Sequence, residues 1–273
     1  METKVLELHP SGFSSFFSCP YAWYRNNLAE NPIRTVGSAA HIGSAIHKAS
    51  EVYYTDCINS SDWVNPVNSA YDDAAVDLFK KRMKEEAPAD IKELNENEAI
   101  NTIRTKKQLY LNNARQLCKT VIPEAVEKTY EVELNSKIPM KIRGTLDIVN
   151  TDSIIDIKTM NRRNDPKKYW IQQGVYALMR EKQGDSVNDL IIHRVLTTKD
   201  EVDSVSILSS GLPEFSIEDL KERVEGLVKT IVKTIELYYK TGDEIVFRGN
   251  PTCMTCSPKY CAYWHDCKFR DLK

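Results

Sequence analysis

The chain has 273 residues, of which 41% are hydrophobic and 28% are charged, and its formal net charge is −2. This composition is ordinary for a soluble globular protein, and the charge argues against a globally basic coat for nucleic acid while allowing a local basic track. No apolar run approaches the ~20 residues of a membrane span, and the N-terminus lacks the basic-then-apolar order of a signal peptide. We therefore expect a cytoplasmic protein with no membrane partner, whose seven cysteines are reduced and free to bind metal.

The N-terminal half is predicted to be helical. Residues 14–25 are typical of a short helix that breaks before Pro20 and resumes as a second, aromatic-rich turn. Small and apolar residues then recur with helical spacing over 43–54. Charges of alternating sign over 62–127 indicate solvated helices, so we predict a helical insertion over about 55–127.

The centre of the chain changes to strand patterns. Alternation of apolar and polar side chains predicts strands at 128–134, 140–150, 153–159, 190–197 and 204–208. A helix is expected over 167–181, and a capping box at Ser216–Asp219 opens a long helix that ends near Tyr239, before Gly242. These patterns predict one α/β domain over 1–273, with a separate cysteine-rich region formed by 248–273 and Cys19.

An acid-acid-lysine pattern lies on the central strands. Side chains alternate along a strand, so Asp156 and Lys158 face one way while Ile155 and Ile157 face the core. A hairpin through 150–153 would bring Asp147, in Gly-Thr-Leu-Asp, toward Asp156. Two carboxylates and the backbone carbonyl of Ile157 would then form an oxygen site for Mg²⁺ or Mn²⁺. Alone, Asp-x-Lys is a weak signal, because edge strands often carry an outward Asp and Lys.

Two helices add polar side chains at one-turn spacing. His47 and Glu51 share a face of the upstream helix, and Gln172 and Tyr176 share a face of the helix that follows the Asp-x-Lys strand. A ligand or substrate role is one interpretation of these pairs. A histidine satisfied within the core and a buried aromatic are the alternatives.

Thiols are concentrated at the C-terminus, where Cys253, Cys256, Cys261 and Cys267 lie within fifteen residues, and Cys19 stands near the start. Three thiolates from the tail and one from Cys19 suffice for a four-cysteine centre, so five candidates compete for four places. Spacing does not decide between an iron–sulfur cluster and structural Zn²⁺.

With the order His, Gly-x-x-Asp, Asp-x-Lys, Gln-x-x-x-Tyr and a cysteine cluster, the chain resembles the RecB-like, AddB-like branch of the PD-(D/E)XK nucleases. The resemblance extends to CRISPR-adaptation and phage exonucleases with an iron–sulfur cluster, and covers Cys19 to Cys267. It implies a restriction-endonuclease-like mixed sheet flanked by helices. The catalytic residues that it implies are Asp147, Asp156, Lys158, Gln172 and Tyr176. The metal ligands that it implies are His47, Asp147, Asp156 and Ile157.

The same resemblance implies a 4Fe-4S cluster on Cys19, Cys256, Cys261 and Cys267, because the tail repeats the family's Cys-Ser-Pro-Lys-Tyr-Cys pattern. Cys253 is the alternate ligand, through its Cys-x-x-Cys spacing with Cys256. The expected role is structural, with the metal joining the two ends of the chain.

A basic stretch follows Lys158 directly. Basic side chains hold phosphates and aromatic rings stack on unpaired bases, so we expect this stretch to contact DNA. A charged loop leading into a solvated helix is the alternative. The expected DNA-binding residues are Arg162, Arg163, Lys167, Lys168, Tyr169 and Trp170.

Together these patterns predict a Mg²⁺- or Mn²⁺-dependent DNA nuclease, in particular an exonuclease in recombination, repair or phage DNA processing. The alternative is a non-catalytic DNA-binding subunit of a larger nuclease or recombination complex. DNA is the expected partner, together with a recombination or single-strand-binding protein.

Overall fold

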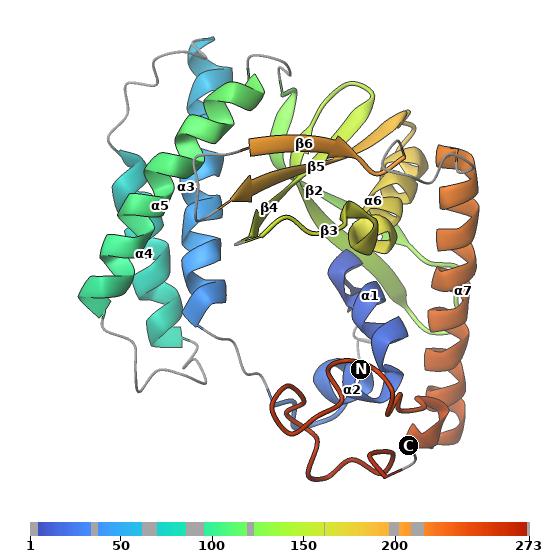
Figure 1. Ribbon diagram of the computed structural model, residues 1–273. Coiled ribbons are helices and arrows are strands. Elements are labelled where there is room, and N and C mark those ends of the chain that lie inside the picture. The colour runs from blue at the N-terminus through green and yellow to red at the C-terminus, as the bar shows by residue number, and fades with distance from the viewer. Residues whose placement is uncertain are drawn as a thin grey trace.

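The computed structural model describes residues 5–33, 38–61, 70–85, 96–118, 123–160, 162–196, 202–208 and 216–271. A six-stranded mixed sheet lies between two groups of helices, as Figure 1 shows. The predicted mixed α/β architecture is therefore confirmed. The strands are β1 (Leu6–Leu8), β2 (Ala125–Glu133), β3 (Met140–Val149), β4 (Ser153–Met160), β5 (Asp189–Leu196) and β6 (Val202–Ser206).

Strand β3 organises the sheet. It pairs with β2 in antiparallel register along most of one edge. Its other edge is shared, because β1 pairs in parallel with Met140–Ile142 and β4 pairs in antiparallel register at Ile148 and Val149. In the described ladders neither strand pairs with residues 143–147, so β3 and β4 separate beyond their hairpin and leave a fork. Sequence analysis predicted the hairpin but not the short strand β1.

Strand β4 is paired along its whole length even though it leaves β3 early. It pairs in parallel with β5 over its whole length, from Ser153 to Met160, and β5 continues into an antiparallel pair with β6. Arg180 of helix α6 (Trp170–Lys182) also fixes the hairpin, since its guanidinium donates to the carbonyls of Asn150, Thr151 and Ser153. The fork is thus bounded by two strands that the sheet holds in place.

The main hydrophobic core covers the face of the sheet that carries α6. Helices α1 (Pro10–Ser18) and α7 (Ile217–Thr241) pack with α6 there, and α2 (Pro20–Asn27) adds its aromatic residues. The predicted capping box of α7 is confirmed, because Ser216 and Asp219 bond reciprocally. Gly242 ends the helix with a φ of 67°, which is favourable for glycine.

Helix α3 (Ser38–Ser60) covers the other face. Its Ile46, Tyr53 and Tyr54 pack against Ile155 and Ile157 of β4. Helices α4 (Ala70–Glu85) and α5 (Glu96–Cys118) stack on the far side of α3 around a second small core of alanines, Phe79 and Ile103. The predicted insertion, about 55–127, includes α4 and α5, but parts of it lie outside the described residues. No helix in the described part of the chain is long and apolar enough to cross a membrane.

Gly144 allows α1, α6 and β3 to approach closely. A Cβ atom at this position would lie 2.7 Å from Cγ of Pro10 and 2.9 Å from Cε1 of Tyr176. Contacts this short require the neighbouring groups to move. The glycine of the Gly-x-x-Asp motif therefore has a packing role, and it holds Tyr176 beside the fork.

We predict that Gly144→Ala destabilises the protein by about 1–3 kcal/mol, because the added methyl group overpacks the junction of α1, α6 and β3. Gly226→Ala is the matched control. Gly226 lies exposed inside α7 with open space around its Cα, so alanine should stabilise the protein there by about 1 kcal/mol. Urea unfolding measures the sign of the change in the free energy of unfolding for each variant. Equal changes in the two variants would contradict the packing role of Gly144.

A candidate metal-dependent active site at the fork of two strands

The fork between β3 and β4 contains the acid-acid-lysine motif. Asp147 extends from β3, and its Oδ2 accepts a hydrogen bond of 2.7 Å from the backbone N–H of Ile157 on β4. The Nζ of Lys158 lies 2.6 Å from Oδ2 of Asp156, whose side chain is almost fully buried. The structure therefore brings Asp147, Asp156 and Lys158 together.

Helix α6 borders the site on the side of Asp156. The Gln172 amide lies 3.5 Å from Oδ1 of Asp156 and donates to the Tyr176 hydroxyl at 3.2 Å. Burial, then the charge of Asp156, raises the pKa of Tyr176, so its hydroxyl stays protonated. Gln172 of the Gln-x-x-x-Tyr motif thus contacts both Tyr176 and Asp156.

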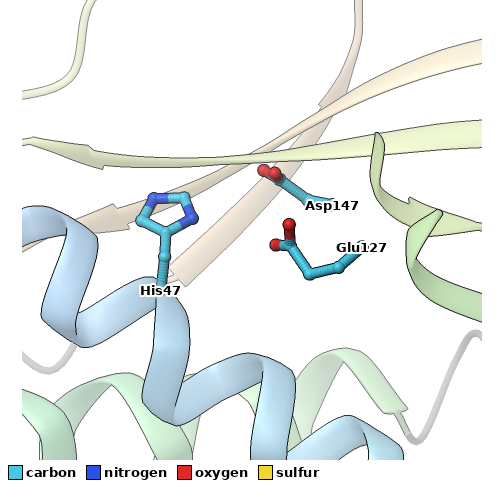
Figure 2. A group of neighbouring side chains, drawn as sticks. All are labelled: His47, Glu127 and Asp147. Carbon is cyan, nitrogen blue, oxygen red and sulfur yellow. The ribbon is translucent and has the colours of Figure 1, made fainter. Parts of the chain in front are cut away.

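A group of possible metal ligands forms on the side of α3. Atoms of His47, Glu127 and Asp147 that can bind metal all lie within 4.8 Å of one another. Figure 2 shows the imidazole and both carboxylates pointing toward one another from the helix and the two strands. One nitrogen and two carboxylate oxygens are a suitable donor set for Mn²⁺ or Mg²⁺. Asp156 and Ile157, the other predicted ligands, lie beside this group.

Glu127 was missed by sequence analysis, which started the strand one residue later, at Lys128. In the ladder Val126 pairs with Ile148 and Lys128 with Leu146, so Glu127 falls opposite Asp147. Its φ is +48°, a left-handed conformation that costs a non-glycine residue about 1–3 kcal/mol. The hairpin register was the signal that could have found it, and the left-handed backbone makes the position a candidate for function.

The histidine is neutral at physiological pH. Burial, reinforced by the positive charge of Lys158, lowers the pKa of His47 to about 4, although Asp156 opposes the shift. A neutral imidazole has a lone pair available for a metal ion. Glu51, on the same helix, forms an ion pair of 2.6 Å with Lys48 and also contributes to the raised pKa of Glu127.

The surroundings of the carboxyl groups in the site disfavour their charged forms. Burial, together with Asp147 and Glu51, raises the pKa of Glu127 to about 8. Burial raises the pKa of Asp156 to about 6 against the opposing charge of Lys158, and it also raises the pKa of Asp147. A divalent cation would compensate these charges, so the residues present suit a bound metal.

Lys158 is cationic in this site. Burial lowers its pKa, but the adjacent carboxylates of Asp156 and Asp147 outweigh burial, and the net pKa lies above its usual value. The ammonium therefore carries a full positive charge next to the carboxylates.

The basic stretch lies at the entrance of α6. Arg162, Arg163 and Lys168 are exposed, whereas Lys167 and Trp170 are half-buried. Tyr169 ends the short 3-10 helix η2 (Pro166–Tyr169), and its ring centroid lies 5.4 Å from Nζ of Lys158 and 4.7 Å from Nζ of Lys168.

A second group of side chains, all thiols, forms where the two chain ends meet. Five cysteines line one cavity: Cys19, Cys253, Cys256, Cys261 and Cys267. All are free thiols, and Cys19 lies at the junction of α1 and α2. Burial, together with the other cysteines, raises the pKa of both Cys256 and Cys261. Backbone N–H groups of Asn250 and Tyr263 donate to the sulfurs of Cys19 and Cys261.

Side chains other than the thiols also pack the C-terminal segment, from Phe247 onward and called the tail below, against α2. The hydroxyl of Tyr263 donates to the Asn26 side chain at 2.7 Å, and its ring lies 4.6 Å from the Arg25 guanidinium. Phe247 stacks on Tyr24 of α2 at 4.9 Å between ring centroids. Figure 1 shows the C-terminal coil lying against α2.

Fold and site together have the form of a candidate metal-dependent active site, with acidic groups and a lysine on two diverging strands. The family description "PD-(D/E)XK nuclease superfamily" matches residues 7–268. The chain therefore belongs to this superfamily, and membership implies metal-dependent nuclease activity on DNA. No curated protein matches the chain.

We predict opposite effects of Glu127→Gln with and without metal. The raised pKa means that metal-free wild-type protein loses stability as pH rises from about 4.5 toward 8, because ionisation is easier in the unfolded chain. The neutral amide avoids this loss, so the variant should melt higher than wild type at pH 8 in chelator and similarly at pH 4.5. Added Mn²⁺ should raise the melting temperature of wild type more than that of the variant.

Differential scanning fluorimetry at the two pH values, with EDTA or with MnCl₂, measures these shifts. An equal response of both proteins to Mn²⁺ would remove Glu127 from the ligand set.

Proposed function

We propose that this chain is a Mg²⁺- or Mn²⁺-dependent DNA exonuclease acting in recombination, repair or phage DNA processing. The observation that carries the proposal is the fork, where an acidic and histidine donor group lies beside a buried Asp–Lys pair. The order of motifs from His47 to the cysteine tail, which resembles RecB-like exonucleases, supports the narrower assignment.

In this proposal His47, Glu127 and Asp147 hold the metal ion, with Asp156 at its edge. When bound, the cation polarises a phosphoryl oxygen and lowers the pKa of an attacking water. Lys158 stabilises the negative charge that develops on the phosphate. Gln172 and Tyr176 orient the Asp156 carboxylate through their mutual hydrogen bond.

The exposed cations after β4 are proposed to guide the DNA backbone to the fork. Arg162, Arg163 and Lys168 are solvent-accessible, and they lie directly downstream of Lys158 in sequence. Half-buried Lys167 and Trp170 border the same entrance. Such contacts act on phosphates without reading sequence, which suits a nuclease that proceeds along a strand.

We also propose that the tail binds a 4Fe-4S cluster through Cys19, Cys256, Cys261 and Cys267, with Cys253 as the alternate ligand. Five free thiols around one cavity support a metal centre, and backbone N–H donors to two sulfurs favour the thiolates. The resemblance of the tail to that of iron–sulfur nucleases favours a 4Fe-4S cluster over structural Zn²⁺, which is the alternative.

We predict that Asp156→Ala and Lys158→Ala each reduce cleavage of end-labelled DNA by at least about 100-fold, because each removes a charged group from the reacting centre. The control is Lys229→Ala, which removes an exposed lysine of α7. Circular dichroism and thermal unfolding check that the variants fold. Wild-type protein that binds DNA but does not cleave it with Mg²⁺ or Mn²⁺ would favour a DNA-binding subunit instead.

We predict that anaerobically purified protein contains iron and acid-labile sulfide, and that Cys19→Ser loses both and melts at a lower temperature. The cluster would close a loop of more than two hundred residues, which constrains the unfolded chain. Tail packing through Phe247 and Tyr263 should leave part of the Cys19→Ser protein folded and able to cleave DNA. Cys57→Ser, at a buried position of α3, serves as the cysteine control for iron and sulfide content.

One equivalent of zinc without iron would contradict the cluster assignment. Normal melting with complete loss of cleavage in Cys19→Ser would contradict its structural role.

A further inference from the structure

The ammonium group of Lys158 lies near two carboxylates, those of Asp156 and Asp147, and near one aromatic ring. It lies 2.6 Å from Oδ2 of Asp156, and 5.4 Å from the ring centroid of Tyr169. A lysine side chain carries its ammonium group on a flexible four-carbon stem, so the position of the ammonium group depends on such contacts. Asp156 also faces Gln172 and the proposed metal site, whereas the aromatic ring has no role there. The ring is therefore the neighbour that can fix Lys158 independently of the metal.

Tyr169 is itself fixed by a series of contacts that returns to the sheet. Its hydroxyl accepts a hydrogen bond of 3.3 Å from the side-chain amide of Asn164. The carbonyl of Asn164 accepts one of 2.9 Å from the guanidinium of Arg194. Arg194 lies on β5 directly beside Lys158 in the parallel register. The segment 164–169 is thus held at two neighbouring positions of the sheet. Arg194 of β5 binds its first residue, Asn164, and Lys158 of β4 lies against its last residue, Tyr169.

The local backbone reinforces this arrangement. Asp165 caps the 3-10 helix by accepting a hydrogen bond of 3.0 Å from the N–H of Lys167, and Pro166 is buried at the first position of that helix. A capped turn with a buried proline restricts the backbone that carries Tyr169. Its ring is half-buried against Lys158 rather than freely exposed to an incoming base.

We propose that Tyr169 is a positioning residue that directs the ammonium group of Lys158 toward the reacting phosphate, with Asn164 and Arg194 holding Tyr169 in place. Attraction between the ammonium and the face of the ring supplies the contact. This inference rests on the proposed nuclease function, and it replaces the expected stacking of Tyr169 on a DNA base. The two roles differ measurably, because positioning acts on kcat and base stacking acts on KM.

The test compares Tyr169→Leu with Tyr169→Phe, using kcat and KM on end-labelled DNA with Mn²⁺. Leucine removes the ring, so kcat should fall about 10- to 100-fold with KM unchanged, as expected for a misplaced catalytic group. Phenylalanine keeps the ring and should restore most of the lost kcat. Tyr239→Leu, at an exposed tyrosine of α7, is the matched control.

A second readout does not need cleavage. Lys158 is modified with an amine-reactive ester, and its rate of labelling is followed by mass spectrometry of the digested protein. The rate should rise several-fold in Tyr169→Leu but not in Tyr169→Phe or Tyr239→Leu. The labelling rates test the contact between Tyr169 and Lys158 even if the wild-type protein does not cleave DNA. The proposed nuclease function is tested separately, by whether cleavage depends on Asp156.

Three results would overturn the inference: a raised KM with unchanged kcat, Mn²⁺ affinity that falls as far as kcat, or unchanged labelling of Lys158 in Tyr169→Leu. The first would return Tyr169 to a DNA contact. The second would show that the ring supports the metal site as a whole.

Discussion

Strand β3 has two edges, yet three strands pair with it, and this constraint shapes the site. Because β2 occupies one edge, β1 and β4 divide the other, and β4 pairs with β3 only at Ile148 and Val149, beside the hairpin. Past that point the backbone N–H of Ile157 has no strand partner on β3, and the Asp147 carboxylate accepts its hydrogen bond instead. A side chain thus continues the contact between two strands that have already separated. The site is built on paired strands, which hold side chains more firmly than loops do.

The same fork accounts for the electrostatics. Two kinds of buried charged group near the fork differ in how their charge is compensated. Arg180 is almost fully buried, yet it is satisfied by three carbonyls and Asp185, so its charge stabilises the hairpin. Asp147 and Asp156 share Lys158 instead. Glu127 has the opposing charge of Lys48, and burial raises the pKa of all three carboxyl groups. Unfavourable charge of this kind, together with the strained backbone at Glu127, is typical of positions kept for binding rather than for stability.

A second centre forms far from the fork by a different kind of packing. Aromatic side chains of α1 and α2 meet Phe247 and Phe269 from the tail, and the chain ends are brought together by hydrophobic contact. The five thiols converge as a consequence, since Cys19 sits between α1 and α2 and the others lie in the tail. Packing therefore prepares this cavity, and a metal centre would add a further constraint on ends that already touch.

Local patterns in the sequence determined much of this protein. Alternation along 153–159 correctly placed Ile155 and Ile157 in the core and Asp156 with Lys158 on the opposite side. The capping box at Ser216 and the glycine at 242 correctly marked the ends of α7. Such signals span a few residues, because they depend on the period of a strand or on hydrogen bonds within one turn.

Only the tertiary structure decided the rest. The register of β2 on β3 set Glu127 opposite Asp147, and a three-residue β1 took Met140–Ile142 on the edge of β3 that it shares with β4. The segment 164–169 that places Tyr169 against Lys158 is held at β4 and β5. These contacts depend on pairing between segments that are distant in sequence, and pairing is chosen by the burial and hydrogen bonding of the whole sheet. No local period encodes that choice, so it appears only when the chain is folded.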